Sequence, residues 1–187
     1  MQQQLVNKAI ESLREGKTIL YPTDTIWGIG CDATDEAAVQ RIFELKNRPE
    51  NKSFLALVDS IPMLERYVPE FPEVCYDLID LTEEPLTIIY EKVNGIAKNA
   101  LAEDGSLGFR VTNDPVCQKL IRGIRKPLIS TSANVSGSPS PTSFHDVQDE
   151  IKNKVDFILG IKQDEICKKP SKIIKINNDG TFKIIRK

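Results

Sequence analysis

Apolar residues recur along the chain at two spacings, and segments of the two kinds alternate. Leu5, Ala9 and Leu13 lie four residues apart, which predicts an amphipathic helix that Gly16 ends. The apolar run "ILY" that follows predicts a buried strand. Further helices are predicted between Asp35 and Pro49 and at 61–68, 72–81, 114–124 and 144–152, and further strands at 53–58, 86–91, 105–111, 126–131, 155–159, 171–177 and 181–187.

Residues that start helices and close turns support these predictions. Asp35 is a suitable N-cap, and Asp114 followed by Pro115 is a typical helix start. The run "NDG" at 178–180 predicts the turn of a C-terminal hairpin. Helices and strands interleave without a repeat, and the only Ser/Pro-rich segment, "SGSPSPTS", is short enough to be a loop. We therefore expect one α/β domain, residues 1–187, on a mixed sheet.

Composition and charge narrow the function. The chain of 187 residues has a net charge of −2, which gives no general attraction to nucleic acid or to an anionic membrane. The four cysteines are far apart and form no CxxC pair, which disfavours a metal or disulfide framework. No apolar run approaches the roughly 18 residues that span a bilayer. These features predict a cytoplasmic protein without membrane contact.

Several common catalytic motifs are missing from the sequence. It contains neither GxxxxGK[ST] nor GxGxxG, so a P-loop and a dinucleotide fingerprint are absent. The single histidine, His145, stands beside Asp146 in the Ser/Pro-rich segment, where a surface position is favoured, and a Ser-His-Asp hydrolase is disfavoured. Cations and hydroxyl groups remain as the available chemistry, which suits a reaction whose nucleophile is already an anion.

Two polar clusters directly follow predicted buried strands. Residues 23–25 ("TDT") follow "ILYP", and residues 130–134 ("STSAN") follow "PLI". Each cluster has a purely structural explanation, as a hydrogen-bonded turn or an ordinary polar loop. Ligands of α/β sheets, however, usually bind at the carboxyl ends of strands, so both clusters are also candidates for lining a polar ligand.

A third candidate feature is the basic segment "KNRPENK", which contains Lys46, Arg48 and Lys52. Lys and Arg are favoured at a helix C-terminus, and that explains Lys46 well. It explains Arg48 and Lys52 less well, because both lie past the expected helix end beside Pro49. A rigid turn that presents Arg and Lys to one point is typical of a phosphate or oxyanion clamp.

Taken in order, "YPTDTIWGIGC", "IFELKNRPENK" and "STSANVSG" resemble the threonylcarbamoyl-AMP synthase family (YrdC-like domain) of the single-domain type, over about residues 18–186. The resemblance implies a twisted mixed sheet flanked by helices, with a concave, positively lined cavity. It also implies a nucleotidyltransferase that converts L-threonine, bicarbonate and ATP to threonylcarbamoyl-AMP and pyrophosphate, for N6-threonylcarbamoyladenosine in tRNA. Mg²⁺ would accompany ATP, with no organic cofactor and no metal ligands from the protein itself. The implied partner is tRNA or a tRNA-modifying transferase.

The resemblance also assigns roles to individual residues. Threonine would be contacted by Thr25, Arg110, Ser130 and Ser171, with Arg110 on its carboxylate. ATP would be bound by Arg48, Lys52, Ser106, Ser132, Asn134, Ser140 and Arg186. The expected catalytic set is Lys46, Arg48, Ser132 and Asn134. Ser132 and Asn134 lie two residues apart, so in extended backbone they would face the same side. Trp27 stands where the family usually has tyrosine, which is expected to reshape the amino-acid pocket.

Two other classes of function stay open from the sequence. An RNA-binding module would use the same concave surface, although the net charge of −2 and 6% aromatic residues provide neither a basic stripe nor many stacking platforms. A paralogue of the same fold that has lost synthase activity would keep most of the motifs. The intact pairs Lys46 with Arg48 and Ser132 with Asn134 argue against such a loss.

Overall fold

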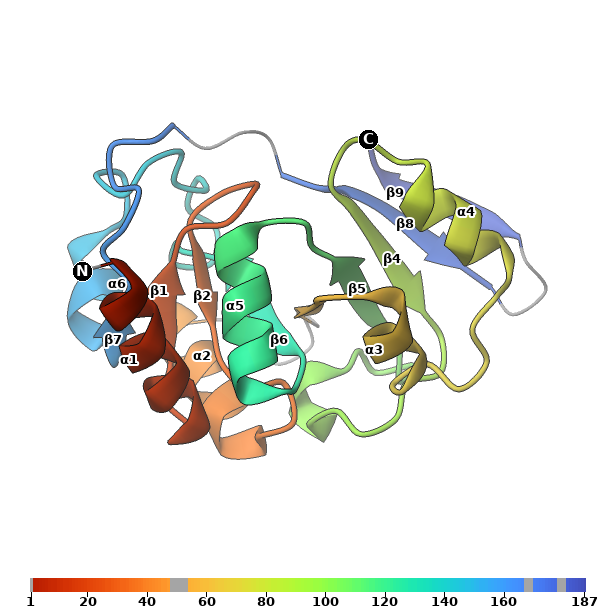
Figure 1. The fold of residues 1–187 in the computed structure, drawn as a ribbon, viewed down its shortest axis with the longest axis horizontal. Helices are drawn as coiled ribbons and strands as arrows, with labels where there is room; N and C mark the ends of the chain where they lie inside the picture. The colour runs from red at the N-terminus through yellow and green to blue at the C-terminus, as the bar shows by residue number, and fades with distance from the viewer. Residues whose placement is uncertain (1, 48–53, 167–169, 178–180) are drawn as a thin grey trace.

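Strands from both halves of the chain join in one mixed sheet in the computed structural model, which describes residues 2–47, 54–166, 170–177 and 181–187 (Figure 1). Nine strands of these residues hydrogen-bond in the order β7-β1-β2-β6-β3-β5-β4-β8-β9. The pairs β1–β7, β3–β5 and β4–β8 are parallel and the other neighbours are antiparallel. The strands are β1 (Ile19–Tyr21), β2 (Gly28–Gly30), β3 (Leu55–Val58), β4 (Leu86–Tyr90), β5 (Leu107–Val111), β6 (Leu128–Ser132), β7 (Phe157–Ile158), β8 (Lys172–Ile176) and β9 (Phe182–Arg186).

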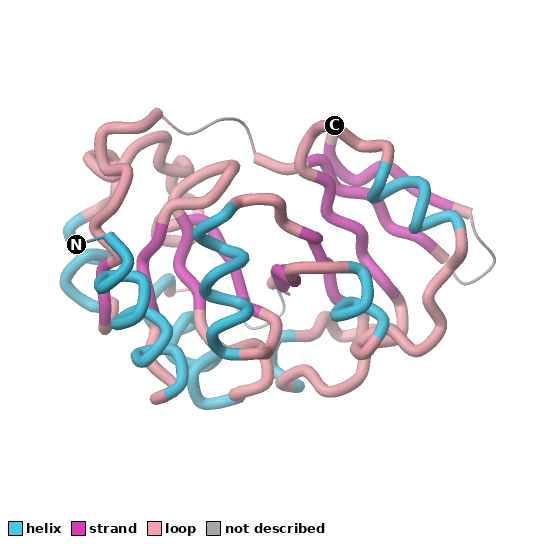
Figure 2. The backbone as a smooth tube through the Cα atoms, in the orientation of Figure 1, coloured by secondary structure: helices cyan, strands magenta, loops and turns pink. Residues whose placement is uncertain are grey.

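Two of the described helices, α2 (Glu36–Lys46) and α5 (Pro115–Ile124), begin at side-chain N-caps that the sequence offers. Asp35 Oδ1 accepts a hydrogen bond from the Ala38 amide at the start of α2, and Asp114 does the same for two amides of α5. Helices α1 and α5 pack against each other and lie in front of β1, β2 and β6 in the view of Figure 2. The helices are α1 (Gln2–Arg14), α2 (Glu36–Lys46), α3 (Ile61–Glu65), α4 (Val74–Asp80), α5 (Pro115–Ile124) and α6 (Asp149–Lys154), with one 3₁₀ turn, η1 (Lys98–Ala100).

The structure corrects two expectations about these elements. Strand β2 has no counterpart among the predicted strands, because its sequence Gly-Ile-Gly lacks β-forming residues at two of three positions. The helix expected at 144–152 is shorter and later, as α6 begins only at Asp149 and turns precede it. The turn expected at 178–180 lies outside the described residues, and among the described helices none is long and apolar enough to cross a membrane.

Candidate active site

A pocket of about 270 Å³ opens on the sheet and is lined mainly by hydroxyl groups, apolar side chains and two arginines. Directly opposed residues of neighbouring strands share one face of a sheet. Two neighbouring rows of this kind, joined by residues 130 and 132 on β6, cross β2, β6, β3, β5 and β4 on one face. Their members line the pocket: Gly28, Ser132, Ser130, Leu55, Gly108 and Ile89. The other lining residues are Thr23, Thr25, Ile26, Phe54, Thr87, Arg110, Thr131, Ser140, Pro170, Ser171, Ile173 and Arg186.

The polar turn after β1 forms one wall of this pocket. Thr23 Oγ1 accepts from the Thr25 amide at 3.0 Å and donates to the Ile26 carbonyl at 2.7 Å, so its hydroxyl closes a tight turn behind Pro22. The structural explanation of this stretch is therefore correct for Thr23. Thr25 is brought to the pocket by the same turn, and its Oγ1 lies 2.9 Å from Thr23 Oγ1.

Arg110 on β5 is the buried cation of the site. Its side chain is 3% exposed. Nη1 donates to Thr25 Oγ1 at 3.2 Å, and Nη2 lies 3.0 Å from Asp24 Oδ1. Its Nε has no hydrogen-bond partner within the part of the chain that the structure describes. A guanidinium has five N–H donors in a planar fork, so Arg110 keeps donors for a ligand carboxylate while Asp24 and Thr25 fix its orientation.

A second guanidinium closes the opposite side of the pocket. Arg186 on β9 donates from Nε to the Ser171 carbonyl at 2.9 Å, and Ser171 Oγ lies 2.8 Å from Thr87 Oγ1. Burial and the positive charge of Arg110 lower the pKa of Arg186, which indicates that the two guanidinium groups feel each other's charge. Because the described lining residues include two arginines and no carboxylate, the pocket favours an anionic ligand.

Lys46 is placed differently from the sequence expectation. Its side chain is buried at 1% exposure, at the end of α2, and it does not line the pocket. Nζ donates to the Asn134 carbonyl at 2.6 Å and also to the Ser132 carbonyl. Among described residues Lys46 therefore ties α2 to the end of β6, and it reaches the pocket only through the backbone that carries Ser132.

The predicted pairing of Ser132 and Asn134 on one side of an extended strand is wrong. Strand β6 ends at Ser132, and the Asn134 amide donates back to the Ser132 carbonyl at 2.9 Å, so the chain turns between them. Ser132 lines the pocket, whereas Asn134 is buried outside it. The Asn134 side chain donates to the Ser138 carbonyl and accepts from Lys46 at 3.4 Å, which indicates that it holds the loop.

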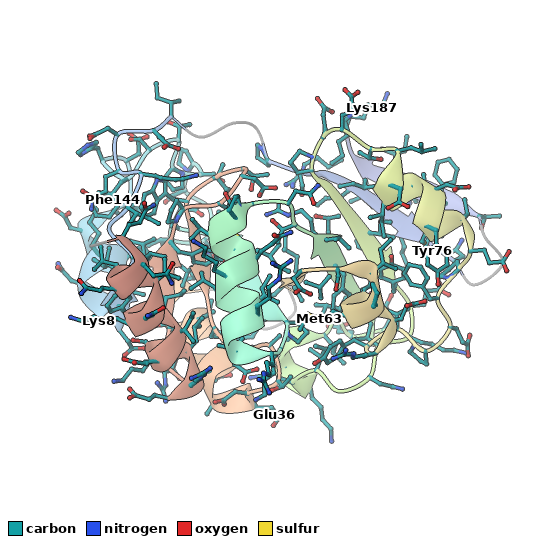
Figure 3. The ribbon with its side chains drawn as sticks, in the orientation of Figure 1. Lys8, Glu36, Met63, Tyr76, Phe144 and Lys187 are labelled. Atoms are coloured by element: carbon teal, nitrogen blue, oxygen red, sulfur yellow. The ribbon has the colours of Figure 1, made fainter. Side chains whose placement is uncertain are left out.

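Two further expectations are corrected by the packing. Ser106 does not line the pocket; its hydroxyl and amide donate to Asp104, and with Lys175 these hydrogen bonds lower the pKa of Asp104 to about 2. Trp27 is fully buried and packs on Phe144 with ring centroids 5.0 Å apart, and it does not line the pocket. The Phe144 side chain is labelled in Figure 3. Arg48 and Lys52, the centre of the expected phosphate clamp, lie outside the described residues.

Of the expected ligand-binding residues, the pocket brings together Thr25, Arg110, Ser130, Ser132, Ser140, Ser171 and Arg186. Sequence reasoning missed Thr87 and Gly108, which form part of the floor. A Cβ on Gly108 would come 3.0 Å from Thr87 Cγ2, so the glycine keeps this floor open. No local signal marks either residue, because their place in the pocket follows from which strands pair.

The donor set also bears on metals. No group of three His, Cys, Asp or Glu side chains in the described residues is arranged to hold a metal ion. Mg²⁺ that is bound through substrate phosphates and water needs few protein ligands. The hydroxyl and guanidinium groups that line this pocket are hydrogen-bond donors that suit anionic oxygens.

Comparison with known proteins identifies the family of this chain. The family model Sua5_yciO_yrdC, described as "Telomere recombination", matches residues 11–187. The threonylcarbamoyl-AMP synthase of Pseudomonas syringae is 33% identical over 156 residues, which covers 83% of this chain and 84% of that protein. The crystal structure of Escherichia coli YciO has a TM-score of 0.85 at 26% identity, over 99% of this chain and 89% of that one. The crystal structure of Pyrococcus abyssi Sua5 complexed with L-threonine has a TM-score of 0.79 at 30% identity and covers 94% of this chain.

Some of these relatives are considerably longer. The chain spans 44% of the curated Pyrococcus abyssi threonylcarbamoyl-AMP synthase, to which it is 34% identical over 148 residues, and 52% of the Sua5 chain in the threonine complex. The similarity nevertheless runs along nearly the whole of this chain, and it confirms the fold and the family that the three motifs indicate. The chain belongs to the Sua5/YciO/YrdC family.

Proposed function

We propose that this protein is an L-threonylcarbamoyl-AMP synthase that condenses L-threonine, bicarbonate and ATP, releases pyrophosphate and supplies tRNA modification. The observation that carries the proposal is Arg110, a buried guanidinium with unused donors next to the hydroxyl-bearing residues Thr25 and Ser130. A guanidinium that can bind a carboxylate, beside hydroxyl groups that can hydrogen-bond a hydroxyl, matches the carboxylate and the side-chain hydroxyl of threonine. The volume of about 270 Å³ suits an amino acid, as it lies below the roughly 300–1,000 Å³ of drug-sized pockets.

The reaction would proceed through an anion. The threonine amino group attacks the carbon of bicarbonate, water leaves, and the N-carboxylate forms. An oxygen of this N-carboxylate then attacks the α-phosphorus of ATP while pyrophosphate leaves. This second step needs no strong base, which agrees with a described pocket lining that contains no histidine and no carboxylate.

Charge would build on the phosphoryl oxygens during the attack, and positively charged groups would stabilise it. Arg186 is the described cation available on the far side of the pocket from Thr25. The family resemblance assigns Arg48 and Lys52 to the same task. Mg²⁺ would neutralise part of the triphosphate charge, and we expect ATP, not a protein carboxylate, to carry it.

Pyrophosphate release tests the proposal directly. The purified protein is incubated with ATP, MgCl₂ and bicarbonate, and each amino acid is added in turn. We expect pyrophosphate release that depends on both threonine and bicarbonate. ATP turnover that needs no amino acid, or no turnover by a folded protein, would contradict the proposal.

The amino-acid preference should follow the hydrogen-bonding side chains of the pocket. Valine lacks the hydroxyl of threonine and would leave buried polar groups unpaired, which can cost a factor of up to about 10⁴ in kcat/KM. Serine lacks only a methyl group, worth roughly 1–3 kcal/mol in an apolar pocket. We therefore expect strong rejection of valine and moderate rejection of serine in competition assays at fixed ATP and bicarbonate. Equal use of valine and serine would show that the pocket does not bind the substrate hydroxyl. The Trp27 ring lies outside the pocket, so we do not expect it to affect this preference.

An RNA-binding module remains the second candidate, through the connection of the family to tRNA. An isolated protein that binds a tRNA anticodon stem but releases no pyrophosphate would favour it. If the protein does release pyrophosphate, tRNA or a transferase partner would take part only in the later transfer of the threonylcarbamoyl group. If the protein is a catalytically inactive paralogue, it should bind threonine without turnover. An equilibrium binding measurement beside the kinetic assay therefore separates an inactive paralogue from an active synthase.

A further inference from the structure

Tyr21 reaches the pocket without lining it. The residue ends β1, is completely buried, and donates a hydrogen bond from its hydroxyl to Ser130 Oγ at 2.8 Å. Ser130 is on β6, and in the sheet β2 lies between β1 and β6. The tyrosine ring therefore crosses over a whole strand to make this contact.

The glycines of β2 make this crossing possible. Tyr21 is directly opposite Gly28, so both glycines of the Gly-Ile-Gly strand lie on the face that carries the tyrosine ring. A Cβ on Gly30 would clash with the Ile129 carbonyl oxygen and would come 2.9 Å from Tyr21 Cε1 and 3.3 Å from its hydroxyl, so the strand backbone and the ring together fill the space of the missing side chain. A Cβ on Gly28 would come 3.3 Å from Ser130 Oγ, on the pocket side. Gly30 thus leaves room for the Tyr21 ring, and Gly28 leaves room beside Ser130 Oγ.

The Ser130 hydroxyl then still has its own proton to donate. A serine hydroxyl has one donor and two acceptor sites. Burial raises the pKa of Tyr21, so its phenol stays protonated at neutral pH, and its hydroxyl donates to Ser130 Oγ. Tyr21 fills one acceptor site of Ser130, and no described residue accepts the Ser130 proton. That proton is available to a ligand in the pocket.

We propose that Tyr21 is a positioning residue that holds Ser130 as a hydrogen-bond donor toward an oxygen of the amino-acid substrate. The ligand atom at Ser130 is then an acceptor, a carboxylate or hydroxyl oxygen, and not the ammonium group. This inference rests on the proposed function, because it takes the ligand beside Ser130 to be threonine.

A double-mutant cycle tests the inference. The full chain is prepared as wild type, Tyr21→Phe, Ser130→Ala and the double variant, and threonine binding is measured by calorimetry together with KM and kcat. Tyr21→Phe should weaken threonine binding and raise its KM about 3–10-fold, the effect of one neutral hydrogen bond, with the KM for ATP unchanged. If Tyr21 acts through Ser130, the double variant binds threonine no more weakly than Ser130→Ala alone.

Tyr90→Phe is the matched control, because Tyr90 is 2% exposed, has its hydroxyl beside the Cys75 thiol and does not line the pocket. It should leave threonine binding unchanged. Additive losses in the cycle, or equal losses in Tyr21→Phe and Tyr90→Phe, would mean that Tyr21 contributes only to folding, and would overturn the inference. Normal threonine binding by Tyr21→Phe overturns it while the synthase proposal stands, whereas a wild-type protein that binds no threonine overturns both.

Discussion

Replacing Arg110 with alanine is expected to lower kcat/KM for threonine by about 10²–10³-fold, because removing one partner of a buried charge pair costs roughly 2–5 kcal/mol. Arg110 would hold the threonine carboxylate, and in the free protein it also holds Asp24 and Thr25 in place. The variant loses the carboxylate receptor and leaves the Asp24 charge without its partner. Steady-state kinetics with threonine varied at saturating ATP measure the loss.

Two further variants show whether the loss is specific to the guanidinium group of Arg110. Arg110→Lys keeps the charge but lacks the planar fork, so it should recover only part of the lost activity. Arg122 also pairs with an aspartate, Asp59, at 3.0 Å, but its side chain is 61% exposed. Arg122→Ala should therefore behave as wild type. Wild-type kcat/KM in a folded Arg110→Ala protein would remove the carboxylate receptor from the proposed site.

Replacing Lys46 with methionine is expected to lower the free energy of unfolding by about 2–4 kcal/mol, and to reduce activity as a consequence. The Lys46 ammonium donates to the carbonyls of Ser132 and Asn134, and each carbonyl left unpaired in the interior costs roughly 1–3 kcal/mol. For a chain of 187 residues this corresponds to a fall of about 5–15 °C in Tm. Thermal unfolding followed by circular dichroism measures it.

The same measurement separates two roles of Lys46. If its ammonium served only to bind ATP phosphates, Lys46→Met would keep the wild-type Tm and lose only activity. Lys92→Met is the control, because the Lys92–Glu70 ion pair is exposed at 57% and 54% and such pairs contribute less than about 1 kcal/mol. Its Tm should stay within a few degrees of wild type.

Interactions between residues that are close in the sequence determine much of this fold. The starts of α2 and α5 follow from Asp35 and Asp114, whose carboxylates accept from the first free amides of each helix. The C-terminal hairpin of β8 and β9 follows from two short apolar segments around a turn sequence. These features depend on residues a few positions apart, so the sequence alone was enough to predict them. The three motifs likewise pointed to the family, and the resemblance to that family assigned binding roles to seven residues that the pocket brings together.

The tertiary structure decided how distant segments meet. Strand β2 exists because its backbone pairs with β1 and β6, and the Tyr21–Ser130 hydrogen bond that crosses it joins residues 109 positions apart, which no local pattern indicates. The turn at Asn134 and the burial of Trp27 similarly depend on neighbours from other elements, Lys46 and Phe144. Sequence therefore determined which residue types are available at the strand ends. Strand pairing determined which of them share one face, because a side chain faces the pocket only when the register of its strand turns it that way.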